Sequence, residues 1–165
     1  MRHSSMTKLS EATALAVHAM VFLASAPEHS WSVKAMAPML KASEAHLSKV
    51  MQRLSTAGFV SSERGPKGGF LLLRKAEDIK LVEIYELFEG PIQQGGCLLG
   101  MEKCPLGGCK ISEFLGKINK EVGEYFSKTT LADIKVEGRP VAVMMEPEGD
   151  LPRFRDRFRF VIFLT

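Results

Sequence analysis

The sequence predicts a mainly α-helical chain with a small β-hairpin wing: a winged helix-turn-helix followed by a long C-terminal helix. Three observations predict this fold class. Residues 43–58 form an amphipathic segment with capping residues at both ends, and residues 59–73 form two short apolar runs around a glycine-rich, basic tip. Residues 111–126 repeat apolar side chains over four helical turns. A capped helix followed directly by a basic hairpin is typical of a winged helix-turn-helix.

Composition and charge indicate one soluble domain, or one domain with an appendage. The chain has 165 residues, of which 45% are hydrophobic and 8% aromatic, enough to form a core. Residues 30–75 hold eight Lys and Arg against two Asp and Glu, a net +6, whereas residues 76–135 hold seven against ten, a net −3. The positive charge therefore concentrates on the predicted helix-turn-helix, where a polyanionic partner would be bound.

The N-terminal segment shares some features with a signal peptide. Residues 1–7 are expected to form a flexible lead, and the apolar run Ala12–Ala26 follows basic residues and ends in small ones. Glu11 and His18 argue against export, because they place polar groups in a run that otherwise keeps the spacing of a packed helix. No stretch reaches the roughly 20 apolar residues of a transmembrane helix. We therefore expect a cytoplasmic protein without membrane contact.

Two helices are predicted before the third, reading helix. Ser10 is placed to cap a first helix that runs to about Ala24. Ser32 is placed to cap a shorter helix, Val33–Leu40, in which Pro38 favours an early end. A tight two-residue turn follows. Helix, short helix, tight turn and helix is the order of a helix-turn-helix, whose last helix enters the major groove of DNA.

The third helix has one apolar and one polar face. Ser43 is a favourable N-cap and Gly58 a favourable residue just beyond the C-terminus, so both ends are defined. The polar face carries short or hydrogen-bonding side chains that can approach base edges, with cations at its margin for phosphates. The residues of this helix expected at DNA are Ser43, Glu44, Ser48, Lys49, Gln52 and Arg53.

A basic hairpin follows the third helix. Strands are predicted at residues 59–60 and 70–73, on either side of a glycine-rich tip at residues 63–69. Arg64 and Lys67 in this tip are expected to contact phosphates. An ordinary amphipathic helix and hairpin packed on a core would also fit the apolar pattern, but it leaves the polar face and the basic tip unexplained.

A cysteine-containing loop is predicted after the helix-turn-helix unit. Apolar residues at helical spacing predict a fourth helix from about Leu81, and Gly90-Pro91 ends it. Cys97, Cys104 and Cys109, the only cysteines of the chain, then lie in a glycine-rich segment that is unsuited to a regular helix. Three clustered cysteines do not resemble the disulfide framework of a secreted protein. Loops this long are usually functional or disordered.

The last predicted helix carries the apolar stripe. Helix-turn-helix proteins commonly pair through such a helix, although packing on its own domain is an equally good interpretation of the pattern. The stripe consists of Ile111, Phe114, Leu115, Ile118, Val122, Tyr125 and Phe126. The predicted organisation is a flexible lead (1–7), a winged helix-turn-helix DNA-binding domain (8–90), a cysteine loop (91–110), a dimerisation helix (111–135) and a tail (136–165) without an assigned role.

Several motifs resemble those of one known family. They are His46-Leu47-Ser48-Lys49-Val50, Arg64-Gly65-Pro66-Lys67-Gly68-Gly69-Phe70, Phe88-Glu89-Gly90-Pro91 and the three cysteines downstream. On these motifs residues 8–134 resemble the IscR/NsrR (Rrf-two) family of bacterial winged-helix transcription regulators. The resemblance implies a homodimeric, sequence-specific regulator that binds double-stranded DNA.

The resemblance also implies a cofactor. In many members of that family three loop cysteines hold an iron–sulfur cluster that senses iron, nitric oxide or redox state. The implied ligands of a 2Fe–2S or 4Fe–4S cluster are Cys97, Cys104 and Cys109, and thiolates are the usual ligands of such clusters. Their spacing is C-x(6)-C-x(4)-C, and Ser112 stands where some members have a histidine. His18 is the candidate for a fourth ligand, contributed by the partner subunit.

Three functions are compatible with the sequence. The first is a cluster-bearing transcription regulator. The second is a regulator of the same fold without a cluster, which responds to a metabolite, a partner protein or thiol oxidation. The third is a small zinc or iron–sulfur protein that binds no DNA, although the sequence has no C-x-x-C zinc motif. The sequence also has no P-loop, nucleophile elbow or zinc-protease helix, so we do not expect an enzyme.

Overall fold

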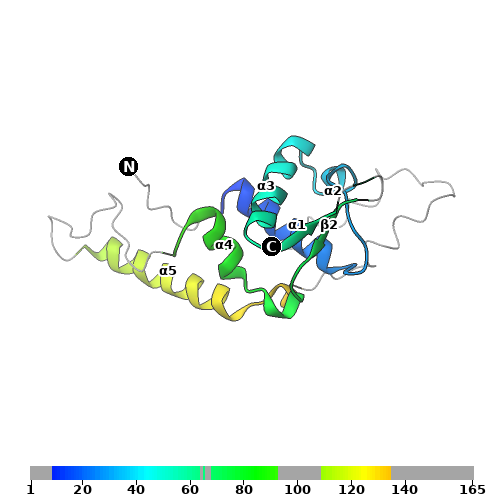
Figure 1. Cartoon of the computed structure of the whole chain (residues 1–165). Coiled ribbons are helices and arrows are strands. Elements are labelled where there is room, and N and C mark those ends of the chain that lie inside the picture. The colour runs from blue at the N-terminus through cyan, green and yellow to red at the C-terminus, as the bar shows by residue number, and fades with distance from the viewer. Residues whose placement is uncertain (1–8, 64, 66–67, 93–108, 135–165) are drawn as a thin grey trace, which may run out of the picture.

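The computed structural model describes residues 9–63, 65, 68–92 and 109–134. The described part is mainly helical with one antiparallel hairpin, which confirms the predicted fold class. Figure 1 shows α4 between the long helix α5 and the remaining helices. The elements are α1 (Glu11–Ala24), α2 (Val33–Met39), α3 (Glu44–Thr56), β1 (Val60–Ser62), β2 (Phe70–Leu72), the 3-10 turn η1 (Ala76–Asp78), α4 (Leu81–Glu89), α5 (Lys110–Lys128) and the 3-10 turn η2 (Leu131–Asp133).

Serine caps define the beginnings of the first three helices, as predicted. The hydroxyls of Ser10, Ser32 and Ser43 each accept a hydrogen bond from a backbone N–H three residues later, at 3.2 Å. A cap of this kind typically contributes about 1 kcal/mol. Helix α2 ends at Met39, one residue earlier than predicted, because the chain turns at Lys41, which has a φ of 52°. The observed β1 begins one residue later and ends two residues later than the predicted strand.

The core lies where α1, α3, α4 and the hairpin meet. Ala16 and Ala19 on α1 are fully buried, and their small size lets α3 and α4 approach α1 closely. The large side chains of this core are Met20, Leu23, Trp31, Met36, Leu47, Met51, Leu54, Ile79, Ile84 and Leu131. Burying one such side chain contributes about 1.5–3 kcal/mol. The apolar run that shares features with a signal peptide is therefore a core helix in this structure. None of the helices among the described residues is long and apolar enough to span a bilayer.

The hairpin is held to the core by Trp31. Strands β1 and β2 pair with Val60 opposite Leu72 and Ser62 opposite Phe70. On the other edge of β2, Phe70 exchanges two backbone hydrogen bonds with Trp31, at 2.9 and 3.1 Å. Trp31 itself is 2% exposed. The hairpin thus extends from a buried anchor in the loop between α1 and α2.

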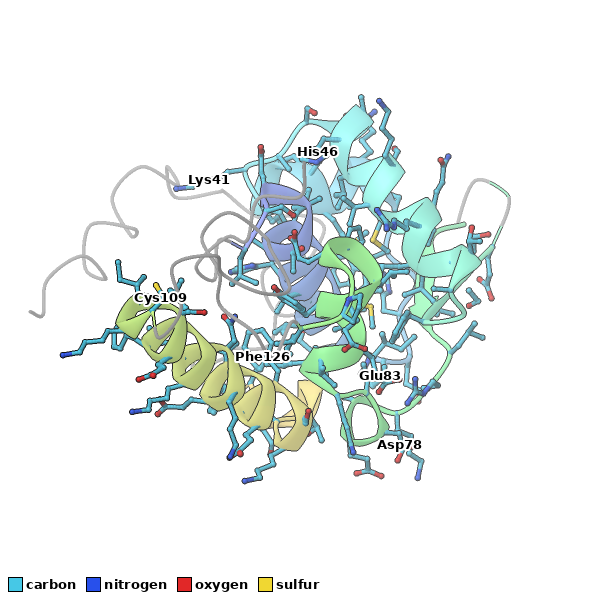
Figure 2. The ribbon with its side chains drawn as sticks, turned by 90° about the vertical axis from the view of Figure 1, so that its left-hand side faces the viewer. Lys41, His46, Asp78, Glu83, Cys109 and Phe126 are labelled. Atoms are coloured by element: carbon cyan, nitrogen blue, oxygen red, sulfur yellow. The ribbon has the colours of Figure 1, made fainter. Side chains whose placement is uncertain are left out.

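Helix α5 packs on the outside of α4 and is fixed at its C-terminal end. The N–H of Leu81 donates to the carbonyl of Thr129 at 3.0 Å, and the N–H of Leu131 donates to the carbonyl of Ile79 at 2.8 Å. The ring of Phe126 meets the ring of Tyr85 on α4 with centroids 5.5 Å apart. Figure 2 shows Phe126 toward this fixed end of α5 and Cys109 at the opposite end.

Candidate nucleic-acid interface

Helix α3 divides into a buried and an open face, as the sequence predicts. Leu47, Val50, Met51 and Leu54 lie in the core, each at most 3% exposed. Around the rest of the helix, Glu44, Lys49 and Gln52 are exposed and Ser48 is half-buried. These side chains of α3, which are expected at base edges and phosphates, are therefore accessible outside the core.

The N-terminal end of α3 lies beside the N-terminal end of α1. The hydroxyl of Ser43 caps the helix, and Ser43 is exposed. Nδ1 of His46 lies 3.6 Å from Oε1 of Glu11, the first residue of α1. The first-turn N–H groups and the dipole of a helix favour anions such as phosphate. This end of α3 is therefore suited to the DNA backbone.

Arg53 contacts the neighbouring helix α4. Its guanidinium donates a hydrogen bond to the carbonyl oxygen of Leu87 on α4 and lies 4.9 Å from the ring centroid of Phe88. This contact could not be predicted from the sequence, because the two partners are more than thirty positions away and nothing in the local pattern of α3 points to α4. The side chain expected at phosphates is thus used to join two helices of its own chain.

The described parts of the wing form a narrow turn. The N–H of Glu63 donates to the carbonyl of Gly69 at 2.9 Å, and the N–H of Gly68 donates to that of Gly65 at 2.9 Å. Gly65 has a φ of 124°, a conformation that favours glycine. Arg64 and Lys67, the predicted phosphate contacts, lie outside the described residues.

Cys109 occupies the N-cap position of α5. It is half-buried, and its side chain makes no capping hydrogen bond. Because the N-terminal end of a helix favours negative charge, a thiolate ligand suits this position. Cys97 and Cys104 lie outside the described residues. Across the described ranges, no group of three or more His, Cys, Asp and Glu residues could hold a metal ion.

His18, the candidate fourth ligand, lies on the exposed side of α1. Its Nδ1 is 2.7 Å from the carbonyl oxygen of Ala14. The other ring nitrogen, Nε2, takes no part in this contact and is the one that would bind a metal. The imidazole lines a cavity of about 310 Å³ together with Glu11, Met39 and Lys41. The chemistry of this donor is compatible with a metal ligand.

A carboxylate of α4 completes the N-terminus of α1. Glu89 accepts hydrogen bonds from the backbone N–H of Ser10, at 2.9 Å, and from the hydroxyl of the fully buried Thr13. Burial acts to raise the pKa of Glu89, but the hydrogen bonds from Ser10 and Thr13 outweigh it, and the pKa lies below its usual range. Glu89 belongs to the Phe88-Glu89-Gly90-Pro91 motif, in which the sequence predicts a role only for Gly90-Pro91, as the end of the helix.

An ion pair joins the exit of the hairpin to α4. The guanidinium of Arg74 donates to Oε2 of Glu83 at 2.7 Å. This hydrogen bond, more than any other influence, holds the pKa of the Glu83 carboxyl below its usual range and raises the pKa of Arg74. The exit of the hairpin is therefore tied to the first turn of α4.

A capped reading helix, a preceding short helix and an anchored hairpin define the winged-helix class of DNA-binding proteins. Residues 9–137 match the Rrf2 family, described as iron-dependent transcriptional regulators. The chain belongs to this family, which confirms the resemblance noted from its motifs.

Individual relatives agree with this assignment. A protein of Aquifex aeolicus (strain VF5), described as an HTH-type transcriptional regulator, is 30% identical over 128 residues, which cover 76% of this chain and 89% of that protein. The structure of CymR (YrzC), the global cysteine regulator of B. subtilis, covers 84% of this chain and 98% of its own, with 27% identity and a TM-score of 0.66. The structure of T. potens IscR covers 77% and 85%, with 30% identity and a TM-score of 0.62.

Proposed function

We propose that this Rrf2-family DNA-binding transcription regulator acts as a homodimer and adjusts its operator affinity through an iron–sulfur cluster on the cysteine loop. The observation that carries the proposal is the position of Cys109. It is at once the last cysteine of the loop and the N-cap of α5. A change at the loop is therefore passed directly to the helix proposed to pair the subunits.

The proposed DNA contacts follow the open face of α3. Glu44, Ser48 and Gln52 face base edges, and Lys49 contacts phosphates, with Ser43 at the N-terminal end of the same surface. Phosphate contacts position a protein on DNA, and contacts with base edges in the major groove specify the sequence. The wing adds phosphate contacts through Arg64 and Lys67. Arg53 lies at the margin of this surface.

The proposed dimer forms through the outer edge of α5. Three large apolar residues on one face of α5 are exposed: Ile111 (53%), Phe114 (59%) and Tyr125 (62%). Exposed large apolar side chains in a row are typical of a protein–protein contact. The proposed domains are then the winged helix-turn-helix (8–90), the cysteine loop (91–110) and the dimerisation helix (111–135), with residues 1–7 as a lead.

The proposed ligands are Cys97, Cys104 and Cys109, with His18 of the partner subunit as the fourth. When bound, an iron–sulfur cluster would supply a group that changes charge and ligation with iron supply, redox state or nitric oxide. The thiolates of this chain would hold the group, and the adjacent glycine N–H groups would donate hydrogen bonds to its sulfurs.

A second candidate function is a cluster-free regulator whose loop cysteines respond as thiols. The similarity to CymR, named as a cysteine regulator, favours this candidate. Thiol oxidation to a sulfenic acid or a disulfide would change the loop without any metal.

Anaerobic purification with iron and sulfide analysis distinguishes these functions. The cluster-bearing regulator is expected to be coloured, and replacement of any one of the three cysteines by Ala is expected to remove the visible absorbance. Protein that contains neither iron nor sulfide after enzymatic reconstitution, and whose DNA affinity changes on thiol oxidation, supports the second function. A protein that contains metal but shows no salt-dependent DNA retention contradicts both.

A further inference from the structure

The last turn of α4 contacts the reading helix and, along the chain, precedes the cysteine loop. Arg53 of α3 donates a hydrogen bond to the carbonyl of Leu87 and places its guanidinium over the ring of Phe88, 4.9 Å from the centroid. The chain then continues through Gly90-Pro91 into the loop. The contact of Arg53 is therefore made to the end of α4, from which the chain enters the segment that carries the cysteines.

This contact suits the chemistry of a helix end. The last four carbonyls of a helix have no partner within the helix, and a cation beside them is favourable. The guanidinium of Arg53 supplies both the hydrogen bond and the charge, and it stacks on Phe88 as guanidinium groups do on aromatic rings. A lysine ammonium would reproduce the charge but not the planar arrangement.

The same turn also holds the first helix. Glu89 accepts hydrogen bonds from Ser10 and Thr13 of α1, and the charge of Arg53 acts on the carboxylate of Glu89. Helices α1 and α3, two helices of the DNA-binding unit, are thus both attached to the final turn of α4. A displacement of that turn would therefore move both helices.

We propose that Arg53 is the positioning residue through which the state of the cysteine loop reaches the reading helix; this inference rests on the function proposed above. A change in the loop shifts the last turn of α4, and Arg53 transmits the shift because it is bonded to Leu87 and stacked on Phe88. The C-terminal half of α3 then moves relative to the DNA. The coupling passes through a defined contact between two packed helices.

The experiment compares Arg53→Gln with Lys49→Gln in two loop states. Both variants remove one positive charge from α3, about one turn apart, but only Arg53 holds α4. Operator affinity is measured anaerobically for the metal-free protein and for protein reconstituted with iron and sulfide. The wild-type protein is expected to differ roughly 5–150-fold between the states. Arg53→Gln is expected to bring this ratio close to one with unchanged iron content, whereas Lys49→Gln keeps the wild-type ratio.

The control also tests the alternative role of Arg53. If Arg53 only contacts a phosphate, both variants lower the affinity in both states and reduce the salt slope by about one unit, with the ratio preserved. A preserved ratio in Arg53→Gln overturns the inference and leaves the proposed function intact. A wild-type protein with equal affinity in both states overturns the proposed function, and the inference falls with it.

A second measurement does not depend on affinity. Amide hydrogen exchange of residues 50–56 is expected to change on reconstitution in the wild-type protein and to stay unchanged in Arg53→Gln. Phe88→Leu retains an apolar side chain but removes the ring, and it is expected to reduce both responses even if Arg53→Gln folds poorly. An exchange response in Phe88→Leu equal to that of the wild-type protein contradicts the proposed route.

Discussion

The backbone of Gly69 lies directly against the backbone of Trp31. A Cβ atom at position 69 would be 2.6 Å from the carbonyl carbon of Trp31 and 2.7 Å from its oxygen. Both neighbours belong to the main chain, and Trp31 is buried, so neither can move aside easily. The base of the wing is therefore held by a contact that only glycine permits.

Gly69→Ala is expected to displace the wing and to weaken DNA binding. Overpacking of this kind typically costs about 1–3 kcal/mol, and the displaced tip no longer places its cations at the phosphates. Thermal unfolding and a salt titration of DNA affinity measure the two effects. Leu73→Ala, at an exposed position just after β2, is the control and should change stability by at most about 0.5 kcal/mol. A Gly69→Ala protein with wild-type stability and salt slope would show that the contact is dispensable.

Phe114→Asp is expected to produce monomers. Phe114 is 59% exposed on the outer edge of α5, so a charge there leaves the fold intact but would be desolvated in the proposed dimer. Lys117→Asp, on the same helix but outside the apolar stripe, should remain dimeric. Sedimentation velocity checks both variants, and a dimeric Phe114→Asp protein would place the pairing surface elsewhere.

Glu83→Gln is expected to reduce the loss of unfolding free energy that the protein shows as the pH falls into the acid range. The pKa of Glu83 is lowered in the folded protein, so its ion pair with Arg74 contributes above the unfolded pKa of about 4.3. That contribution is lost as the pH falls through the folded pKa. The pair is partly exposed, so the loss is at most about 1 kcal/mol. Chemical denaturation between pH 3 and 7 measures it. Glu77→Gln is the control, and identical profiles for the two variants would rule out a special role for Glu83.

Lys41→Gly is expected to stabilise the fold. Lys41 has a φ of 52°, and a left-handed conformation costs a side-chain-bearing residue about 1 kcal/mol or more. Glycine removes this cost but is less constrained in the unfolded state, so a gain of up to about 1 kcal/mol is expected. Lys34→Gly, within α2, should instead lose about 1 kcal/mol. Denaturant titrations decide, and a less stable Lys41→Gly protein would mean that the lysine side chain contributes more than the backbone costs.

The local parts of the fold could be predicted because local chemistry determines them. Ser10, Ser32 and Ser43 mark helix beginnings by their hydroxyls, and apolar spacing marks the buried face of α3. The 3-10 turn η1 was not predicted from the sequence. Such short turns depend on tertiary contacts, here the hydrogen bond from the N–H of Leu131 to the carbonyl of Ile79, the residue after the turn.

The contacts that arrange the site could not be predicted from local patterns. Arg53 and Leu87 are 34 positions apart, and Ser10 and Glu89 are 79 positions apart. Periodicity places Arg53 at the margin of a polar face, but it does not distinguish a phosphate from a neighbouring helix end. The Phe88-Glu89-Gly90-Pro91 motif was useful as a mark of resemblance, and its role as an attachment for α1 became visible only in three dimensions.

The fixed C-terminal end of α5 makes this helix a lever with its pivot at residues 129–131. With 19 residues at 1.5 Å each, the arm is about 28 Å long. A displacement of about 5 Å at Cys109 therefore turns α5 by only about 10° at the pivot. A large displacement of the cysteine end of α5 thus corresponds to a small rotation of the helix beside α4. A residue of α5 close to the pivot therefore moves much less than Cys109 does.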